Sequence, residues 1–114
     1  MDKFISNKFP FHTEINVNVN LDYENSQLLK EFVLKLIEEG EKNFLFEMEN
    51  VEIFTSEAVG TIIYLFQIVR KKGGDIKYVY LHPTVTGTFE LLRLTRVFEI
   101  FNDLDFARRC FEFR

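Results

Sequence analysis

Hydrophobic and polar residues alternate strictly from Thr13 to Leu21, where four aliphatic side chains are interleaved with three asparagines. A repeat of two residues predicts a strand with one apolar face and one solvent-facing face. The segment from Phe4 to Phe9, which Pro10 ends, predicts a short strand that pairs with it. Further apolar runs predict strands at Phe44 to Met48, Ile76 to Leu81 and Val97 to Phe101.

Helical spacing replaces this alternation in two long segments. From Ser26 to Gly40 the apolar residues form one broad stripe. Asn25 or Ser26 can cap its start, and Gly40 can end it. From Ser56 to Lys72 the same spacing recurs, and basic residues precede the two glycines that end it, as is typical of helix ends.

Two shorter helices complete the pattern. One is predicted from Thr84 to Leu94, and we expect its buried side to carry Val85, Phe89 and Leu92. The other is predicted from Leu104 to Phe111.

Strands and helices therefore alternate along most of the chain. Such strand–helix–strand units imply right-handed crossovers and mainly parallel pairing. We predict a single α/β domain over residues 1–114, with a mixed, largely parallel sheet of about four to five strands and helices mainly on one face. The expected core contains Val17, Val19, Phe32, Leu36, Phe46, Ile62, Phe66, Val79 and Phe89.

Composition and charge exclude several classes of protein. With 46% hydrophobic residues, the 114-residue chain can bury a core, which excludes a disordered protein. No apolar run is long enough to span a membrane, and we expect no secretory signal. The one cysteine, Cys110, occupies an apolar helical position and suits a reducing compartment, so we expect a cytoplasmic protein. A net charge of −4 argues against nucleic acid or an anionic membrane as a partner.

Residues that could support catalysis do not gather in the sequence. His12 and His82 each lack a cysteine or second histidine at ligand spacing, so we expect both at the surface or in turns. Glu47, Glu49 and Glu52 are separated by strand parity and a turn, which favours a solvated edge over an acid–base pair. We therefore expect no enzymatic activity, no metal and no cofactor.

The segment from Val51 to Gly60 links the strongest strand to the longest helix. Thr55 and Ser56 lie where that helix starts, next to free backbone N–H groups and the positive end of the helix dipole. One interpretation is a helix cap by either residue, with Glu57 favourable in the first turn. The other is a phosphorylatable serine, because a helix start tolerates added negative charge. The two interpretations are compatible, and we expect the Ser56 hydroxyl to lie in solvent.

The order of several short motifs resembles the STAS domain family, which includes anti-sigma factor antagonists and the tails of sulfate transporters. The resemblance covers nearly the whole chain. The matching segments are Leu21 to Asn25, Val51 to Gly60, Lys72 to Gly74, Leu81 to Pro83 and Leu94 to Phe101. In the family, a partner kinase phosphorylates the first serine of the loop, which Ser56 matches.

This resemblance implies a bacterial switch protein in transcription regulation. The unphosphorylated antagonist binds an anti-sigma factor, a serine-protein kinase of the GHKL type, and so frees a sigma factor. A homodimer is also compatible with the resemblance. The implied contact surface, with Ser56 as its phosphorylation site, consists of Asp22, Tyr23, Asn25, Thr55, Ser56, Glu57, Ala58 and Val59.

Four positions depart from the family pattern. Thr55 replaces an aspartate, Glu57 replaces a second serine, and Ala58 replaces a glycine. Arg93 stands where a glycine usually closes the third helix. Two alternatives stay open: a STAS accessory subunit of a membrane transporter, and a degenerate STAS module without phosphorylation.

Overall fold

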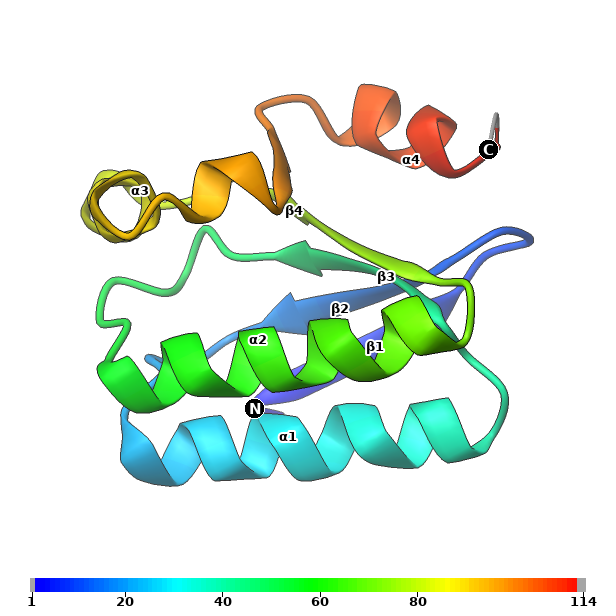
Figure 1. Ribbon diagram of the computed structural model, residues 1–114, viewed down its shortest axis with the longest axis horizontal. Helices are drawn as coiled ribbons and strands as arrows, with labels where there is room; N and C mark the ends of the chain where they lie inside the picture. Colours follow the sequence, from blue (N-terminus) through cyan, green and yellow to red (C-terminus); the bar gives the residue numbers. More distant parts are fainter. Residues whose placement is uncertain (1, 113–114) are drawn as a thin grey trace.

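The computed structural model describes residues 2–112, which fold into one five-stranded sheet with helices on both sides (Figure 1). The order of strands and helices confirms the predicted order, with a short 3₁₀ helix added. The elements are β1 (Phe4–Lys8), β2 (Thr13–Val17), α1 (Tyr23–Glu38), β3 (Asn43–Glu47), α2 (Ser56–Lys71), β4 (Asp75–Val79), α3 (Pro83–Leu91), the 3₁₀ helix η1 (Leu94–Arg96), β5 (Glu99–Phe101) and α4 (Leu104–Glu112).

The sheet is mixed and largely parallel, as the sequence predicts. Its strand order is β1-β2-β3-β4-β5. β1 pairs with β2 in the antiparallel direction, and each of the other neighbours is parallel. The carboxyl ends of β2, β3 and β4 therefore meet at one edge of the sheet, and the loops that follow β2 and β3 lie side by side there (Figure 1).

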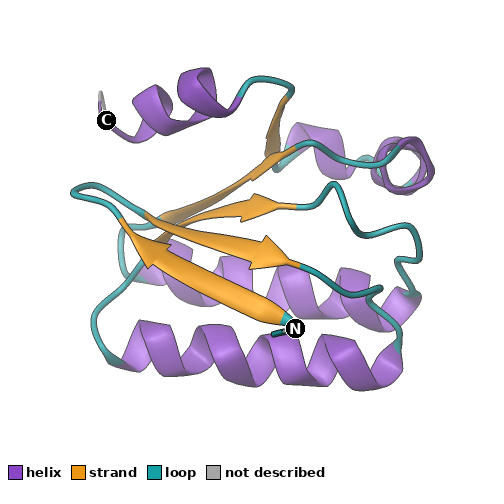
Figure 2. Cartoon of the chain, turned by 180° about the vertical axis from the view of Figure 1, so that it is seen from behind, coloured by secondary structure: helices purple, strands orange, loops and turns teal. Residues whose placement is uncertain are grey.

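The two faces of the sheet are covered unequally. α1 and α2 lie on one face and α4 lies on the other (Figure 2). Buried residues of α3, Val85 and Phe89, join the core that α1 and α2 form with the sheet. Beneath α4 is a smaller apolar cluster of Leu45, Val79, Ala107 and Phe111. This arrangement confirms that the helices lie mainly on one face.

Most of the predicted core is buried or packs against the core. The fully buried members are Val17, Phe46, Ile62, Val79 and Phe89. Phe32, Leu36 and Phe66 are half-buried and pack against these residues. Val19 was predicted wrongly: β2 ends at Val17, four residues before the predicted end, and Val19 lies half-buried in the loop beyond it.

The predicted start of the first long helix is also wrong by three residues. α1 begins at Tyr23, and the Asp22 side chain caps it by accepting a hydrogen bond of 2.8 Å from the Asn25 N–H. Neither Asn25 nor Ser26 is the cap. Gly40 does end the helix, with a φ of +105° that favours glycine.

Leu92 was expected on the buried side of the third helix, but its side chain is 50% exposed. The reason is a backbone reversal: α3 ends at Leu91, and Arg93 has a φ of +58° in the left-handed region. This turn directs the chain into η1, so the helical face of Val85 and Phe89 does not continue to Leu92. Arg93 thus occupies a conformation that favours the glycine of the family pattern.

Candidate functional site

Thr55 and Ser56 have different roles at the start of α2. The Thr55 hydroxyl donates a hydrogen bond of 2.9 Å to the Leu21 carbonyl and accepts one of 3.4 Å from the Ala58 N–H. Thr55 is therefore the cap of α2. Ser56 is exposed, and its hydroxyl donates a bond of 3.3 Å to the carboxylate of the half-buried Glu57. The structure thus agrees with the expectation that the Ser56 hydroxyl lies in solvent.

Apolar neighbours fix this orientation of Ser56. Phe54 precedes the cap and packs against the core, with its ring centroid 5.5 Å from that of Phe89. Val59 packs against the same core, and the Ala58 side chain is 1% exposed. Because these residues are held inward, Ser56 is left on the outer side of the first turn.

The loop after β2 is joined to this loop by backbone hydrogen bonds. The Leu21 N–H donates to the Ile53 carbonyl at 2.9 Å, and the Thr55 N–H donates to the Leu21 carbonyl at 3.1 Å. Leu21 and Phe54 thereby form a parallel bridge. Both segments of the predicted contact surface, 22–25 and 55–59, consequently lie at the same edge of the sheet.

The predicted contact residues differ in their accessibility. Asp22, Tyr23 and Ser56 are exposed, and Tyr23 is 63% exposed. The remaining residues Asn25, Thr55, Glu57 and Val59 are half-buried, and Ala58 is buried. The role of each in binding a partner stays a prediction.

Asn20 belongs to this site but was not among the predicted residues. Its side-chain oxygen accepts hydrogen bonds of 2.8 Å from the Glu52 N–H and 3.0 Å from the Ile53 N–H. The alternating pattern placed Asn20 on the wet face of a strand, whereas β2 has already ended at Val17. The sequence feature that could have identified Asn20 is its position directly before Leu21 and Asp22, because asparagine side chains commonly bind backbone groups in loops.

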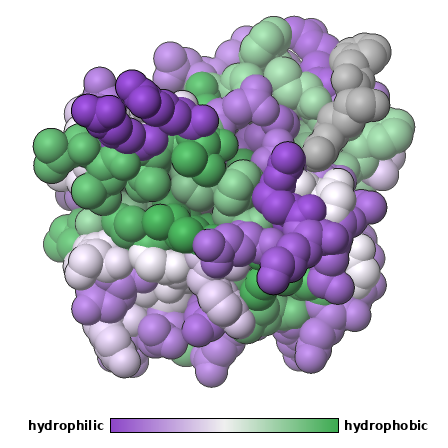
Figure 3. All heavy atoms as spheres, viewed as in Figure 1, coloured by the Kyte–Doolittle hydropathy of each residue, from purple (hydrophilic) through white to green (hydrophobic). Residues whose placement is uncertain are grey.

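The surface around Ser56 combines acidic and apolar groups. Asp22, Glu24 and Glu52 are exposed there, and Ile53 is 53% exposed. On the face seen in Figure 3, hydrophobic residues also gather in a band above α2, toward α3 and η1. Contiguous apolar surface of this kind is typical of a protein-binding face. The exposed large apolar residues in α2 and in the segment from the end of α3 to the residue after η1 are Ile63, Tyr64, Leu91, Leu92 and Val97.

A second polar cluster lies under α4 and includes His12. His12 lies in the turn between β1 and β2, which is one of its two predicted placements, but it is not at the surface. It is 6% exposed, and its ring stacks between Phe9 and Phe111 with centroid distances of 5.0 and 4.6 Å. Its Nε2 is 3.0 Å from Glu14 Oε2. Arg108 binds the same carboxylate twice, at 2.5 and 2.9 Å. We call His12, Glu14 and Arg108 the buried cluster.

The environment shifts the pKa of two glutamates on this face in opposite directions. Burial alone would raise the pKa of Glu14, but hydrogen bonds from Arg108 and His12 outweigh burial and hold the pKa below its usual value. Within residues 2–112 no such hydrogen bond reaches Glu47, so burial, assisted by the charge of Glu14, raises its pKa. Glu47 is thus half-buried rather than part of a solvated edge, contrary to the prediction.

His82 caps α3, because its Nδ1 accepts a hydrogen bond of 3.2 Å from the Thr84 N–H. Its Nε2 lies 3.9 Å from a Glu52 carboxylate oxygen. His82 therefore lies in a turn, as predicted. Within residues 2–112, no three His, Cys, Asp or Glu side chains gather as they would to hold a metal ion.

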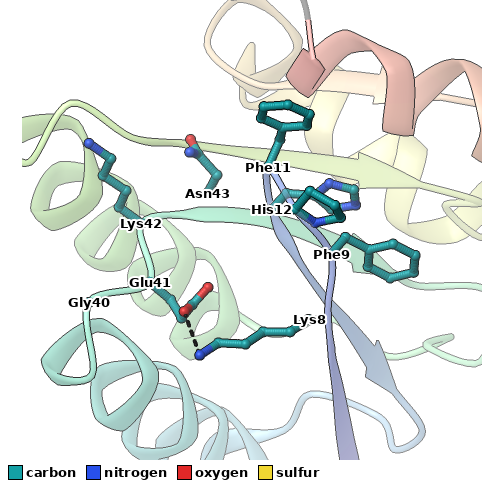
Figure 4. Close-up of a pocket in the computed structure, with 9 residues that line it drawn as sticks. Lys8, Phe9, Phe11, His12, Gly40, Glu41, Lys42 and Asn43 are labelled. Carbon is teal, nitrogen blue, oxygen red and sulfur yellow. Dashed lines mark ion pairs between the residues drawn. The ribbon is translucent and has the colours of Figure 1, made fainter.

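A cavity of about 220 Å³ lies at the opposite edge of the sheet from Ser56 (Figure 4). It is bounded by the turn between β1 and β2 and by the segment between α1 and β3. Lys8 and Glu41 form an ion pair of 3.1 Å on its wall. This cavity is therefore separate from the loops that surround Ser56.

None of the helices described in residues 2–112 is sufficiently long and apolar to cross a membrane.

The family model of the STAS domain matches residues 7–107, so the chain belongs to the STAS domain family. Solved structures share its fold. A proposed anti-sigma factor antagonist from Thermotoga maritima has a TM-score of 0.91 at 21% identity, covering 96% of this chain and 94% of that one. The phosphorylated Bacillus cell fate determinant SpoIIAA has a TM-score of 0.74 at 15% identity, covering 94% and 98%. RsbS of Moorella thermoacetica, solved as a serine-to-glutamate variant, has a TM-score of 0.80 at 15% identity, covering 97% and 96%.

Proposed function

We propose that this protein is an anti-sigma factor antagonist whose binding to its partner is controlled by phosphorylation of Ser56. The observation that carries the proposal is the exposed Ser56 hydroxyl at the start of α2, beside the exposed start of α1, in a chain with the STAS fold. Its structural neighbours include SpoIIAA in its unphosphorylated and its phosphorylated form. The proposal treats residues 1–114 as one STAS domain that acts by binding and performs no catalysis.

The hydrogen bonds favour Ser56 over Thr55 as the phosphate acceptor. Thr55 uses its hydroxyl to bind the Leu21 carbonyl and to cap α2, so its modification would break the cap. The Ser56 hydroxyl has only the Glu57 carboxylate as a hydrogen-bond partner among the described residues, and a kinase can displace that contact. The Thr55 hydroxyl therefore caps the helix, and the adjacent Ser56 hydroxyl is the one proposed to accept the phosphate.

The proposed partner is an anti-sigma factor that is also a serine kinase of the GHKL type, in the cytoplasm. The exposed Tyr23 and Ile53 side chains, one from each of the two joined segments, supply apolar contact area near Ser56. Asp22 supplies an exposed carboxylate for cationic groups of the partner. A homodimer is compatible with this proposal, because the surface around Ser56 is a small part of the molecule.

Charge explains how a phosphate would act as a switch. A phosphate adds about −1.5 to −2 charges, which a helix start tolerates. The partner, however, would have to desolvate this charge next to Glu57. Like-charge or unpaired contacts at an interface can cost several kcal/mol. Phosphorylation should therefore weaken the complex without unfolding the antagonist.

The test is phosphorylation by the purified cognate kinase with ATP, followed by mass spectrometry of the peptides. We expect one phosphate, on Ser56, and none in a Ser56→Ala variant. Ser6→Ala is the matched control, because Ser6 is also exposed but lies on β1. Phosphate on another residue, or none on the wild type, would contradict the proposal, and the latter would favour a degenerate STAS module.

A further inference from the structure

Asn20 joins the two loops that surround Ser56. Its Oδ1 accepts hydrogen bonds from two successive backbone N–H groups, those of Glu52 and Ile53, at 2.8 and 3.0 Å. Neither Glu52 nor Ile53 lies within a strand or helix, so these N–H groups have no place in a regular hydrogen-bond ladder. One side-chain oxygen thus fixes the loop three to four residues before Ser56.

The other end of this connection is the start of α1. The Asn25 side chain donates a hydrogen bond of 2.9 Å to the Asn20 carbonyl, and its oxygen accepts one of 2.9 Å from Lys3 Nζ. Asn20 is therefore held by its backbone to α1 while its side chain holds the loop before α2. This connection joins the segment that carries Asp22 and Tyr23 to the segment that leads to Ser56.

We propose that Asn20 is a positioning residue, which holds the loop 52–55 so that Ser56 and the start of α1 are presented together to one partner. The inference rests on the proposed function of Ser56, which it deepens. Asn20 does not touch the serine. It acts through the backbone of Glu52 and Ile53, and the bridge between Leu21 and Phe54 completes the attachment.

Variants of Asn20 can distinguish this positioning role from a contribution to the overall stability of the fold. The contact requires only a short side chain with an acceptor oxygen, because the donors are backbone N–H groups. Asn20→Asp keeps such an acceptor and Asn20→Ala removes it. Phe54 and Val59 still pack into the core in both variants, so we expect the fold to persist. Asn16 is a matched control, being a half-buried asparagine of β2 whose side chain lies outside the loops around Ser56.

The first measurement is amide hydrogen exchange by NMR, which needs no partner. We expect exchange at the Glu52 and Ile53 amides to become at least about tenfold faster in Asn20→Ala and to stay near the wild-type rate in Asn20→Asp and Asn16→Ala. Amides in the centre of α2 should keep their rates, which shows that the change is local. Unchanged exchange at Glu52 and Ile53 in Asn20→Ala would overturn the inference.

The second measurement is the rate of Ser56 phosphorylation by the purified kinase. We expect kcat/KM to fall at least about tenfold in Asn20→Ala and to recover in Asn20→Asp. Faster loop exchange with an unchanged kcat/KM would overturn the positioning role. A wild type that is not phosphorylated would refute the proposed function and with it this role, whereas the exchange data would still decide whether Asn20 holds the loop.

Discussion

The site around Ser56 and the buried cluster under α4 are both rich in polar side chains, but they use them differently. In the buried cluster, the Glu14 carboxylate has three hydrogen bonds, and its side chain is 2% exposed. Around Ser56, polar groups also bind the backbone, yet the serine itself is exposed. The polar groups of the first region bind one another, whereas the second presents the exposed Ser56 hydroxyl beside exposed carboxylates.

This comparison shows that a collection of catalytic-looking residues does not by itself mark a functional site. His12, Glu14 and Arg108 are residue types that proton transfer uses. His12 lines the cavity of Figure 4, but its side chain is buried, as is that of Glu14. Here they connect the first strands to α4 across most of the sequence, and they also pack against aromatic rings. We therefore expect changes in the buried cluster to affect stability, and changes at Ser56 to affect partner binding.

The largest expected change in stability is that of Arg108→Met. The substitution leaves the buried Glu14 carboxylate with His12 as its one remaining partner, and an uncompensated buried charge is costly. We expect the free energy of unfolding at pH 7 to fall by about 3 kcal/mol, measured by denaturant unfolding, while partner affinity stays unchanged. Arg109→Met, an exposed neighbour on α4, is the control and should change stability little. A stable Arg108→Met protein that no longer bound its partner would show that the buried cluster serves binding rather than stability.

A smaller change is expected at Arg93, which lies in neither region. Its φ of +58° is unfavourable for a residue with a side chain. Arg93→Gly should therefore raise the free energy of unfolding by about 0.5–1 kcal/mol, seen as a higher melting temperature. Arg96→Gly is the control, because Arg96 lies within η1 with negative φ, and it should not stabilise the protein. Loss of stability in Arg93→Gly would show that the Arg93 side chain makes a contact that outweighs the strain.

The smallest change concerns pH and the contrast between Glu14 and Glu47. The lowered pKa of Glu14 contributes stability that is present above the usual value of 4.5 and is lost as the pH falls through the lower folded pKa. The raised pKa of Glu47 has the opposite effect on the free energy of unfolding. Its protonated form is favoured in the folded protein, so stability is lost as the pH rises through the pKa of Glu47 in the folded state. Glu47→Gln should therefore stabilise the protein at pH 7 by on the order of 0.5 kcal/mol and have little effect at pH 3.5. Urea unfolding at both pH values tests this, and an equal effect at both would exclude the proposed titration.

The sequence predicts the fold well because the main core follows from local apolar patterns. The alternation in β2 and the helical stripes of α1 and α2 are repeated signals, and the ends of α2 carry a cap and two glycines. Contacts between distant residues could not be predicted in this way. Arg108 and Glu14 are 94 positions apart, so nothing near His12 reveals that a later helix buries it. Asn20 was missed for the same reason, because its partners lie 32 and 33 positions later in the chain.

The most direct test of the account is the affinity of the purified partner for this protein before and after Ser56 is phosphorylated. Titration calorimetry should compare the wild type, its phosphorylated form and the unphosphorylated Arg108→Met variant, each confirmed to be folded at the temperature used. We expect phosphorylation to weaken binding at least about tenfold, which is roughly 1.4 kcal/mol, and the Arg108→Met variant to bind like the wild type. Equal affinities of the phosphorylated and unphosphorylated forms would contradict the claim that Ser56 is the switch.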